Sequence, residues 1–163
     1  MRFEKISKKQ YEKDIKELMD KKDIEAHLTH EAIQLPKRAT KGSAGYDFFL
    51  PVSLTIQPHE RTPLIPSGIR CKLDENSVML IFVRSSIGIK KGLNLSNGTG
   101  VIDSDYYNAS NEGHIQLSFV NTSEEPITLK LGEKIAQGVI TNYVIADDDD
   151  VDKERVGGFG STN

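Results

Sequence analysis

Hydrophobic residues recur with different spacings along the chain, and the first zone, residues 1–30, has a helical spacing. This zone contains no Gly or Pro. Its apolar side chains recur three or four positions apart: Tyr11, Ile15, Leu18 and Met19. Ser7 and Gln10 have the spacing of a capping box, and Ile6 lies where a hydrophobic staple begins. The pattern predicts an N-terminal helix over residues 8–22, whose apolar side packs against the protein or against another subunit.

The second zone, residues 31–145, holds all six prolines and many short apolar or alternating runs. These runs are 46–49, 54–56, 68–73, 78–83, 113–120, 127–131 and 134–143. Many short strands separated by turn residues are typical of an all-β sandwich or barrel. We therefore expect one β domain here, preceded by the helical extension.

The third zone, residues 146–163, reads as a tail. The aspartates of 147–150 cannot pack against one another, so we expect a solvated, mobile tether. The chain then ends in a Gly-rich segment that contains Phe159. This segment is either a disordered terminus or a flexible flap whose backbone amides wrap an anion while Phe159 covers a flat group.

Composition narrows the class of protein. The 163 residues fit one domain with a core of its own. The net charge is −3, and residues 147–155 alone carry −4, so the rest of the chain is nearly neutral. A nearly neutral domain without a basic patch argues against a nucleic-acid binder. The longest apolar run, 78–83, is too short to span a membrane, and the N-terminus lacks the apolar region of a signal peptide. A lone Cys71 excludes an internal disulfide, so we expect a cytoplasmic protein.

Three segments carry candidate chemistry. Arg84, Ser85 and Ser86 supply a guanidinium and two hydroxyls, which suit phosphate oxygens. Asp103 and Asp105 follow a Gly-rich turn and would share a face if the segment is extended. One of these carboxylates could deprotonate a water, or the segment could be an Asx-turn that ends a strand.

Other candidates are weaker. Asp47 is a lone acid in a predicted strand and could simply pair with an arginine. The four histidines lack the spacing of metal ligands.

In order along the chain, five segments resemble the motifs of the trimeric dUTP pyrophosphatases (dUTPases), with features of the Gram-positive bacterial and phage branch. The segments are 44–47, 84–86, 97–106, 132–137 and 157–162. The resemblance implies a β jelly roll that forms a homotrimer, with active sites shared between subunits. It implies hydrolysis of dUTP to dUMP and pyrophosphate with Mg²⁺, which keeps uracil out of DNA and supplies dUMP for thymidylate synthesis.

The resemblance also assigns roles to residues. Asp103 is the expected general base, Tyr106 packs on the deoxyribose, and Asn97 with backbone near 114–116 reads the uracil. The other expected substrate contacts are Arg84, Ser85, Ser86, Gly100, Val101, Ile102, Gln137, Arg155, Phe159, Gly160, Ser161 and Thr162. No direct protein ligand is expected for Mg²⁺, which the substrate phosphates and water would hold near Asp47 and Asp105.

The chain departs from the family pattern in several places. Lys134 replaces the usual arginine of the fourth motif, Arg155 lies one residue nearer the following glycines, and 107–111 looks longer than the usual hairpin. The N-terminal helix lies outside the family core. Two alternatives stay open: a relative of dCTP deaminase, and a regulatory protein that uses this fold to bind a protein partner, for which the helix and the long hairpin are the available surfaces.

Overall fold

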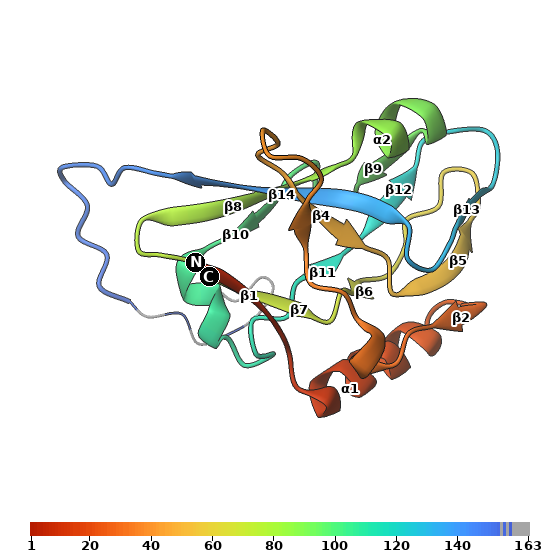
Figure 1. Ribbon diagram of the computed structural model, residues 1–163, viewed down its shortest axis with the longest axis horizontal. Coiled ribbons are helices and arrows are strands. Elements are labelled where there is room, and N and C mark those ends of the chain that lie inside the picture. Colours follow the sequence, from red (N-terminus) through yellow and green to blue (C-terminus); the bar gives the residue numbers. More distant parts are fainter. Residues whose placement is uncertain (154, 156, 158–163) are drawn as a thin grey trace.

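The structure is a computed structural model that describes residues 1–153, 155 and 157. Short β-strands dominate it, and two helices lie at the periphery (Figure 1). The all-β prediction is therefore confirmed. The predicted tail contacts Phe159, Gly160, Ser161 and Thr162 lie outside the described residues.

The largest sheet positions most of the candidate site residues. Its strand order is β10 (Gly100–Ile102), β8 (Ser77–Val83), β14 (Lys134–Asn142), β4 (Tyr46–Phe49) and β3 (Lys37–Arg38), all antiparallel. In this register Ile102 pairs with Met79 near the start of β8, whereas Arg84 follows the last residue of β8. Asp103 therefore lies beside the start of β8, whereas Arg84 lies at its other end.

Smaller sheets complete the fold. The strands pair as β13 (Ile127–Leu129) with β5 (Val52–Ile56) and β2 (Ala26–His27), β12 (Phe119–Asn121) with β9 (Leu93–Leu95), β11 (Gln116–Leu117) with β6 (Ile65–Pro66), and β1 (Arg2–Lys5) with β7 (Ile69–Lys72). Two 3₁₀ helices, η1 (His30–Ala32) and η2 (Ser104–Asn108), interrupt the loops. Alternate apolar residues of these strands fill one shared core, for example Leu54 on β5 and Phe119 on β12.

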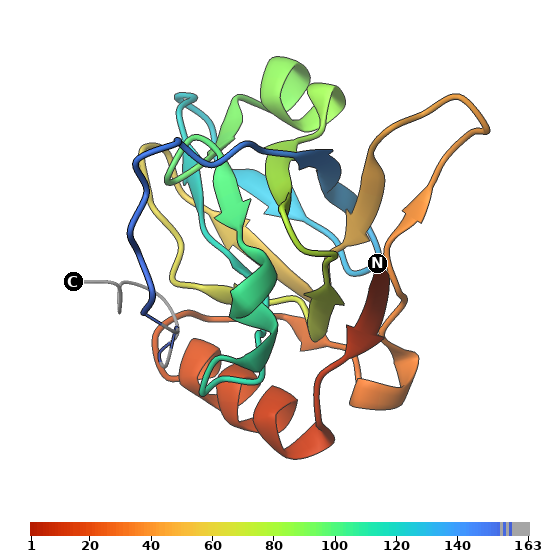
Figure 2. The ribbon, with the colours of Figure 1, turned by 90° about the vertical axis from the view of Figure 1, so that its left-hand side faces the viewer.

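Helix α1 (Lys8–Met19) begins where the sequence predicts and ends three residues earlier than expected. Ser7 is its N-cap and accepts a hydrogen bond from the Gln10 backbone amide at 3.2 Å. The reciprocal bond of a capping box is absent, because Glu112 accepts from the Ser7 amide while the Gln10 side chain bonds to Asp14. The apolar side of α1 joins the shared core, and Figure 2 shows the helix running beneath the segment that carries η2.

Three local structures were not predicted in the form that the structure has. Residues 85–91 form helix α2 (Ser85–Lys91), which ends at Gly92 with a φ of 70°. The predicted strand over 113–120 is divided into β11 and β12. The segment after Asp103 is the 3₁₀ helix η2 rather than extended backbone.

Two further observations bear on the predicted class. Cys71 is buried with a free thiol, so the described residues contain no disulfide. Among the helices that the structure describes, none has the length and apolar character that crossing a bilayer requires.

Candidate active site

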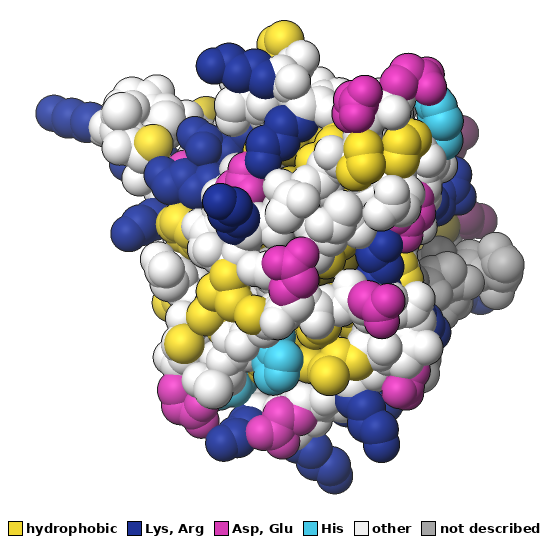
Figure 3. All heavy atoms as spheres, turned by 90° about the vertical axis from the view of Figure 1, so that its right-hand side faces the viewer, with side chains coloured by type: hydrophobic (Ala, Val, Ile, Leu, Met, Phe, Trp, Pro, Cys, Tyr) yellow, Lys and Arg dark blue, Asp and Glu magenta, His cyan; other side chains and the backbone are white. Residues whose placement is uncertain are grey.

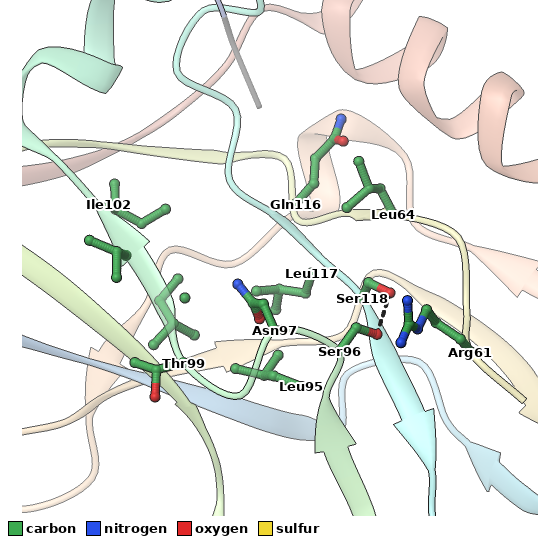
Figure 4. A pocket seen from close by; sticks show the side chains of 13 residues that line it. Arg61, Leu64, Leu95, Ser96, Asn97, Thr99, Ile102, Gln116, Leu117 and Ser118 are labelled. Carbon is green, nitrogen blue, oxygen red and sulfur yellow. Dashed lines mark hydrogen bonds between the residues drawn. The ribbon is translucent and has the colours of Figure 1, made fainter. Parts of the chain in front are cut away.

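A cavity of about 530 Å³ lies between the segment 95–102, which connects β9 to β10, and the segment 116–118 (Figure 4). A cavity of this size is in the range of small-molecule sites. The connection turns at Gly98, whose φ is 74°. Four of the predicted substrate contacts line the cavity: Asn97, Gly100, Val101 and Ile102.

Several lining residues were not found by sequence reasoning. These residues are Arg61, Leu64 and Ser118. They lie in segments distant in sequence from residues 95–102, and they belong to no local motif. Ser96 and Ser118 both line the cavity, and their hydroxyl groups form a hydrogen bond of 2.7 Å (Figure 4). Within the backbone segment expected to read the uracil, Gln116 lines the cavity, whereas the His114 side chain is fully buried.

Asp103 is the first residue after β10 and has extended backbone angles. Its side chain does not bond back to the amides of η2, so the Asx-turn interpretation is not supported. Instead, Arg155 Nη2 donates to Asp103 Oδ2 at 2.7 Å, and Arg155 Nε donates to Asp105 Oδ1 at 3.0 Å. The two carboxylates are therefore brought together by a shared guanidinium and not by an extended strand.

Tyr106 lies one turn further on and is buried. Its hydroxyl donates to the His114 carbonyl oxygen at 2.8 Å and accepts from Asn111 Nδ2 at 2.8 Å. The Arg155 guanidinium carbon lies 5.6 Å from the centre of the Tyr106 ring. Burial raises the pKa of the Tyr106 phenol, so the hydroxyl stays protonated and the ring stays oriented at neutral pH.

A second group of candidate residues meets at the other end of the large sheet. Asp47 on β4 is 3% exposed and lies 3.0 Å from both Arg84 Nε and Lys134 Nζ. The interpretation of Asp47 as the partner of an arginine is thus confirmed. The Lys134 contact has the distance of an ion pair but not the angles of a hydrogen bond, and Asp47 Oδ2 makes no hydrogen bond among the described residues.

The same end of the sheet carries an excess of positive charge. Lys37 and Lys134 both lie against the Phe49 ring, 5.7 and 5.9 Å from its centre. In the space-filling view of Figure 3, Lys and Arg side chains gather at the upper left. Since one Asp47 carboxylate balances only part of this charge, the region is suited to a polyanion.

Gln137 and the two serines belong to this basic end. Gln137 pairs with Asp47 across the β14–β4 ladder, and its side chain packs so closely on Gly45 that a Cβ there would lie 2.5 Å from Gln137 Oε1. Ser85 and Ser86 are exposed at the start of α2, directly after Arg84. The first, second and fourth of the segments that resemble family motifs therefore come together.

The basic end and Asp103 are well separated within one chain. Asp103 lies beside Val78, with which it lines a pocket at the start of β8, and Arg84 follows the end of β8 six residues later. At the rise of an extended strand this separation is about 20 Å. The described residues contain no cluster of three or more histidine, cysteine or carboxylate side chains that could enclose a metal ion.

Comparison with known proteins identifies the family. The sequence profile of the family described as dUTPase matches residues 31–163. The chain is 42% identical over 143 residues to the deoxyuridine 5′-triphosphate nucleotidohydrolase of Lactococcus lactis, and the match covers 86% of this chain and 95% of the relative.

Solved structures agree with the sequence match. The dUTPase crystal structure from Streptococcus mutans is 34% identical with a TM-score of 0.69, and the match covers 90% of this chain and 99% of that chain. A variant of the dUTPase from phage phi11 of S. aureus, described as coordinating a structural Mg(II) ion, is 21% identical with a TM-score of 0.63 and covers 80% of this chain and 96% of its own. On the matched profile, the sequence identity and the shared fold, this chain belongs to the dUTPase family.

Proposed function

We propose that this protein hydrolyses dUTP to dUMP and pyrophosphate, and so keeps uracil out of DNA and supplies dUMP for thymidylate synthesis. One observation carries the proposal: the strand that lines the nucleoside-sized cavity, β10, ends directly at Asp103. A relative with 42% identity is a deoxyuridine 5′-triphosphate nucleotidohydrolase, which supports the same reaction.

Asp103 acts as the general base. Its side chain is 46% exposed, so a water molecule can reach the carboxylate. The carboxylate takes a proton from this water as the water oxygen attacks the α-phosphorus. The bond from the α-phosphorus to the bridging oxygen breaks, and pyrophosphate leaves with that oxygen.

The cavity selects the nucleoside. The Asn97 side chain and the backbone beside Gln116 read the uracil edge, because a pocket of buried donors and acceptors rejects a base that leaves them unpaired. The Tyr106 ring packs on the deoxyribose and leaves no room for a 2′-hydroxyl. Its two hydroxyl hydrogen bonds support this role, since they fix where the ring lies.

The phosphate contacts come from a second copy of the chain. Arg84, Ser85, Ser86 and Gln137 lie at the basic end of the sheet, about 20 Å from Asp103 of the same chain by the strand rise. A triphosphate cannot reach from one end to the other. We therefore infer that Asp103 of one subunit and Arg84 of the next meet at one substrate, in the homotrimer that the resemblance to the trimeric dUTPases implies.

Exposed apolar side chains beside Asp103 support this assembly. Val101, Tyr143, Val144 and Ile145 are all at least 43% exposed, on β10 and just beyond β14. Exposed apolar groups gathered in this way are typical of a surface that another subunit covers.

Subunit mixing tests the shared site. Asp103→Asn and Arg84→Ala are each expected to be inactive. When the two variants are unfolded together in equal amounts and refolded, random assembly places an intact Asp103 opposite an intact Arg84 in about a quarter of the sites. Recovery of about a quarter of wild-type turnover supports the shared site, and no recovery would show that both residues act within one chain.

Arg155 and the tail complete the site. In the structure, Arg155 pairs with Asp103 and Asp105. The substrate phosphates compete for this guanidinium, so Arg155 transfers to them and releases Asp103 for its water. Phe159, Gly160, Ser161 and Thr162 close over the nucleotide, with Phe159 stacked on the uracil; this role rests on the sequence alone.

The dUTPase family uses Mg²⁺, and the residues near Asp103 fit a hydrated ion. The side chains of Asp103 and Asp105 are 46% and 54% exposed, which suits an ion that keeps most of its water. When bound, Mg²⁺ neutralises and orients the three phosphates. Asp105 would contact its water shell, whereas the buried Asp47 contacts the neighbouring side chains of Arg84 and Lys134.

A substrate panel tests the reaction. Pyrophosphate release is measured with dUTP, dCTP, dTTP and UTP, each with Mg²⁺, and ammonia is measured in parallel. Release from dUTP alone supports the proposal. Ammonia from dCTP would indicate a deaminase instead, and tight dUTP binding without release would indicate a nucleotide-controlled binding protein.

A further inference from the structure

The N-terminal extension lies outside the residues that the family profile matches, yet a buried bond ties it to the nucleoside site. Asp14 on α1 is 6% exposed, and its Oδ2 lies 2.5 Å from Nδ1 of the fully buried His114. His114 belongs to the segment between η2 and β11. A pair of buried polar side chains therefore joins helix α1 to the segment between η2 and β11.

The protonation state of this pair follows from its hydrogen bonds. The Gly68 amide donates to His114 Nε2 at 2.8 Å, so Nε2 carries no proton. The ring proton is then on Nδ1 and is donated to Asp14. Although burial alone would raise the pKa of Asp14, bonds from His114, Gln10 and Gln116 hold that pKa below its ordinary 3.8. The pair is a neutral histidine held by an ionised carboxylate.

The same histidine holds Tyr106. Its carbonyl oxygen accepts the Tyr106 hydroxyl at 2.8 Å, and Asn111 Nδ2 bonds to that hydroxyl from the other side. Two residues beyond His114, Gln116 lines the nucleoside cavity and also a cavity of about 180 Å³ against Asp14. A displacement of His114 would therefore reach the sugar-facing ring and the wall of the cavity together.

Further hydrogen bonds join the N-terminal extension to residues 107–112, the segment that follows Tyr106. The Ser7 amide and hydroxyl donate to the two carboxylate oxygens of Glu112 at 2.7 and 2.6 Å. The Tyr107 hydroxyl donates to Glu4 at 2.6 Å. The extension and the segment 107–112 thus contact each other.

We propose that Asp14 and His114 are positioning residues for substrate selection: through them α1 holds Tyr106 and the 114–116 backbone where the deoxyribose and uracil are recognised. The extension is then a brace for the nucleoside pocket and not only a cover for the core. This inference rests on the proposed dUTP hydrolysis for its functional readout. Neither residue touches the substrate.

The test compares three changes on the same helix. Asp14→Leu keeps the approximate size but leaves the buried His114 Nδ1–H without an acceptor, Asp14→Asn keeps an acceptor oxygen, and Glu17→Leu changes an exposed acid as the matched control. The readout is kcat and KM for dUTP and for UTP. We expect Asp14→Leu to lower the preference for dUTP over UTP about tenfold, mainly through a higher KM for dUTP, as fits the loss of one charge-assisted hydrogen bond.

Asp14→Asn is expected to restore most of that preference, and Glu17→Leu to leave it unchanged. A loss of folded enzyme alone would lower kcat equally for both nucleotides, because it changes only the active fraction. An unchanged preference in folded Asp14→Leu would overturn the proposal. If that variant does not fold, Asp14→Ala replaces it, since the smaller side chain leaves room for a water.

Hydrogen exchange separates failure of the brace from failure of the proposed reaction. The Gly68 amide bonds to His114 Nε2, so we expect it to exchange at least tenfold faster in Asp14→Leu than in wild type and Glu17→Leu. Unchanged exchange contradicts the brace whether or not the protein hydrolyses dUTP. An absence of dUTP hydrolysis by the wild type contradicts only the proposed reaction.

Discussion

Gly113 lies where the backbone after Tyr106 leaves no room for a side chain. Its φ is 68°, and a Cβ there would lie 2.7 Å from the Tyr106 carbonyl oxygen and 2.7 Å from Tyr107 Cα. Both are backbone atoms, which cannot rotate away as the end of a side chain can. We predict that Gly113→Ala destabilises the protein and shifts the turn that carries Tyr106.

The magnitude follows from two separate costs. A left-handed backbone costs a residue with a Cβ about 1–2 kcal/mol. Forcing a methyl group into a filled space costs about 1–3 kcal/mol more. Gly132→Ala is the matched control, because Gly132 has a φ of 80° with nothing within 4 Å of its Cβ position and so carries only the first cost.

The assay is thermal unfolding followed by circular dichroism, at one fixed protomer concentration because subunit assembly affects the midpoint. For a chain of this length, 1 kcal/mol shifts Tm by about 2–4 °C. We expect Tm to fall by roughly 2–8 °C in Gly132→Ala and by roughly 4–20 °C in Gly113→Ala. Equal falls in the two variants would refute the reasoning, since they would show that the backbone contact has no energetic consequence.

Three further predictions concern the phosphates, the metal and acid stability. Arg84→Lys should raise KM for dUTP about tenfold in steady-state assays, because lysine keeps the charge but not the planar donor pair; an unchanged KM would remove Arg84 from the phosphate site. Chelation of divalent cations should abolish most pyrophosphate release and Mg²⁺ should restore it; full turnover in chelator would contradict a role for the ion. The pKa of Asp14 is lower in the folded protein than its ordinary 3.8, so Asp14 stabilises the fold above that pH and the contribution is lost as pH falls through the folded pKa. Urea unfolding between pH 6 and 3 should therefore show a smaller loss of stability in Asp14→Asn than in wild type, and equal losses would contradict this role.

Strands with strong local patterns were predictable from the sequence. The run 46–49 coincides with β4, and 78–83 differs from β8 by one residue, because each is a short, mostly apolar run between polar and turn residues. Helix α2 was missed because Ser86, Gly88 and two isoleucines give residues 85–91 a weak helix propensity. Burial of Ile87 and the left-handed Gly92 stabilise this helix, and neither is a local pattern.

The candidate site shows the same limit. The chemistry of segment 97–106 can be predicted from the local sequence, because glycines, carboxylates and a tyrosine follow one another in a fixed order. The Asp14–His114 bond joins residues 100 positions apart, and Arg61 and Leu64 reach the cavity only through the fold. The pairing of Arg155 with Asp103 likewise joins residues 52 positions apart, which no local motif specifies.

The most direct test of the account is dUTP turnover by Asp103→Asn, measured as pyrophosphate release with Mg²⁺ beside wild type, with dUTP affinity measured on the same samples. Asparagine keeps the shape of the side chain but cannot take a proton from water. We predict a fall in kcat of about 10²–10⁴-fold with dUTP affinity retained. Turnover within a few fold of wild type would contradict the assignment of Asp103 as the general base.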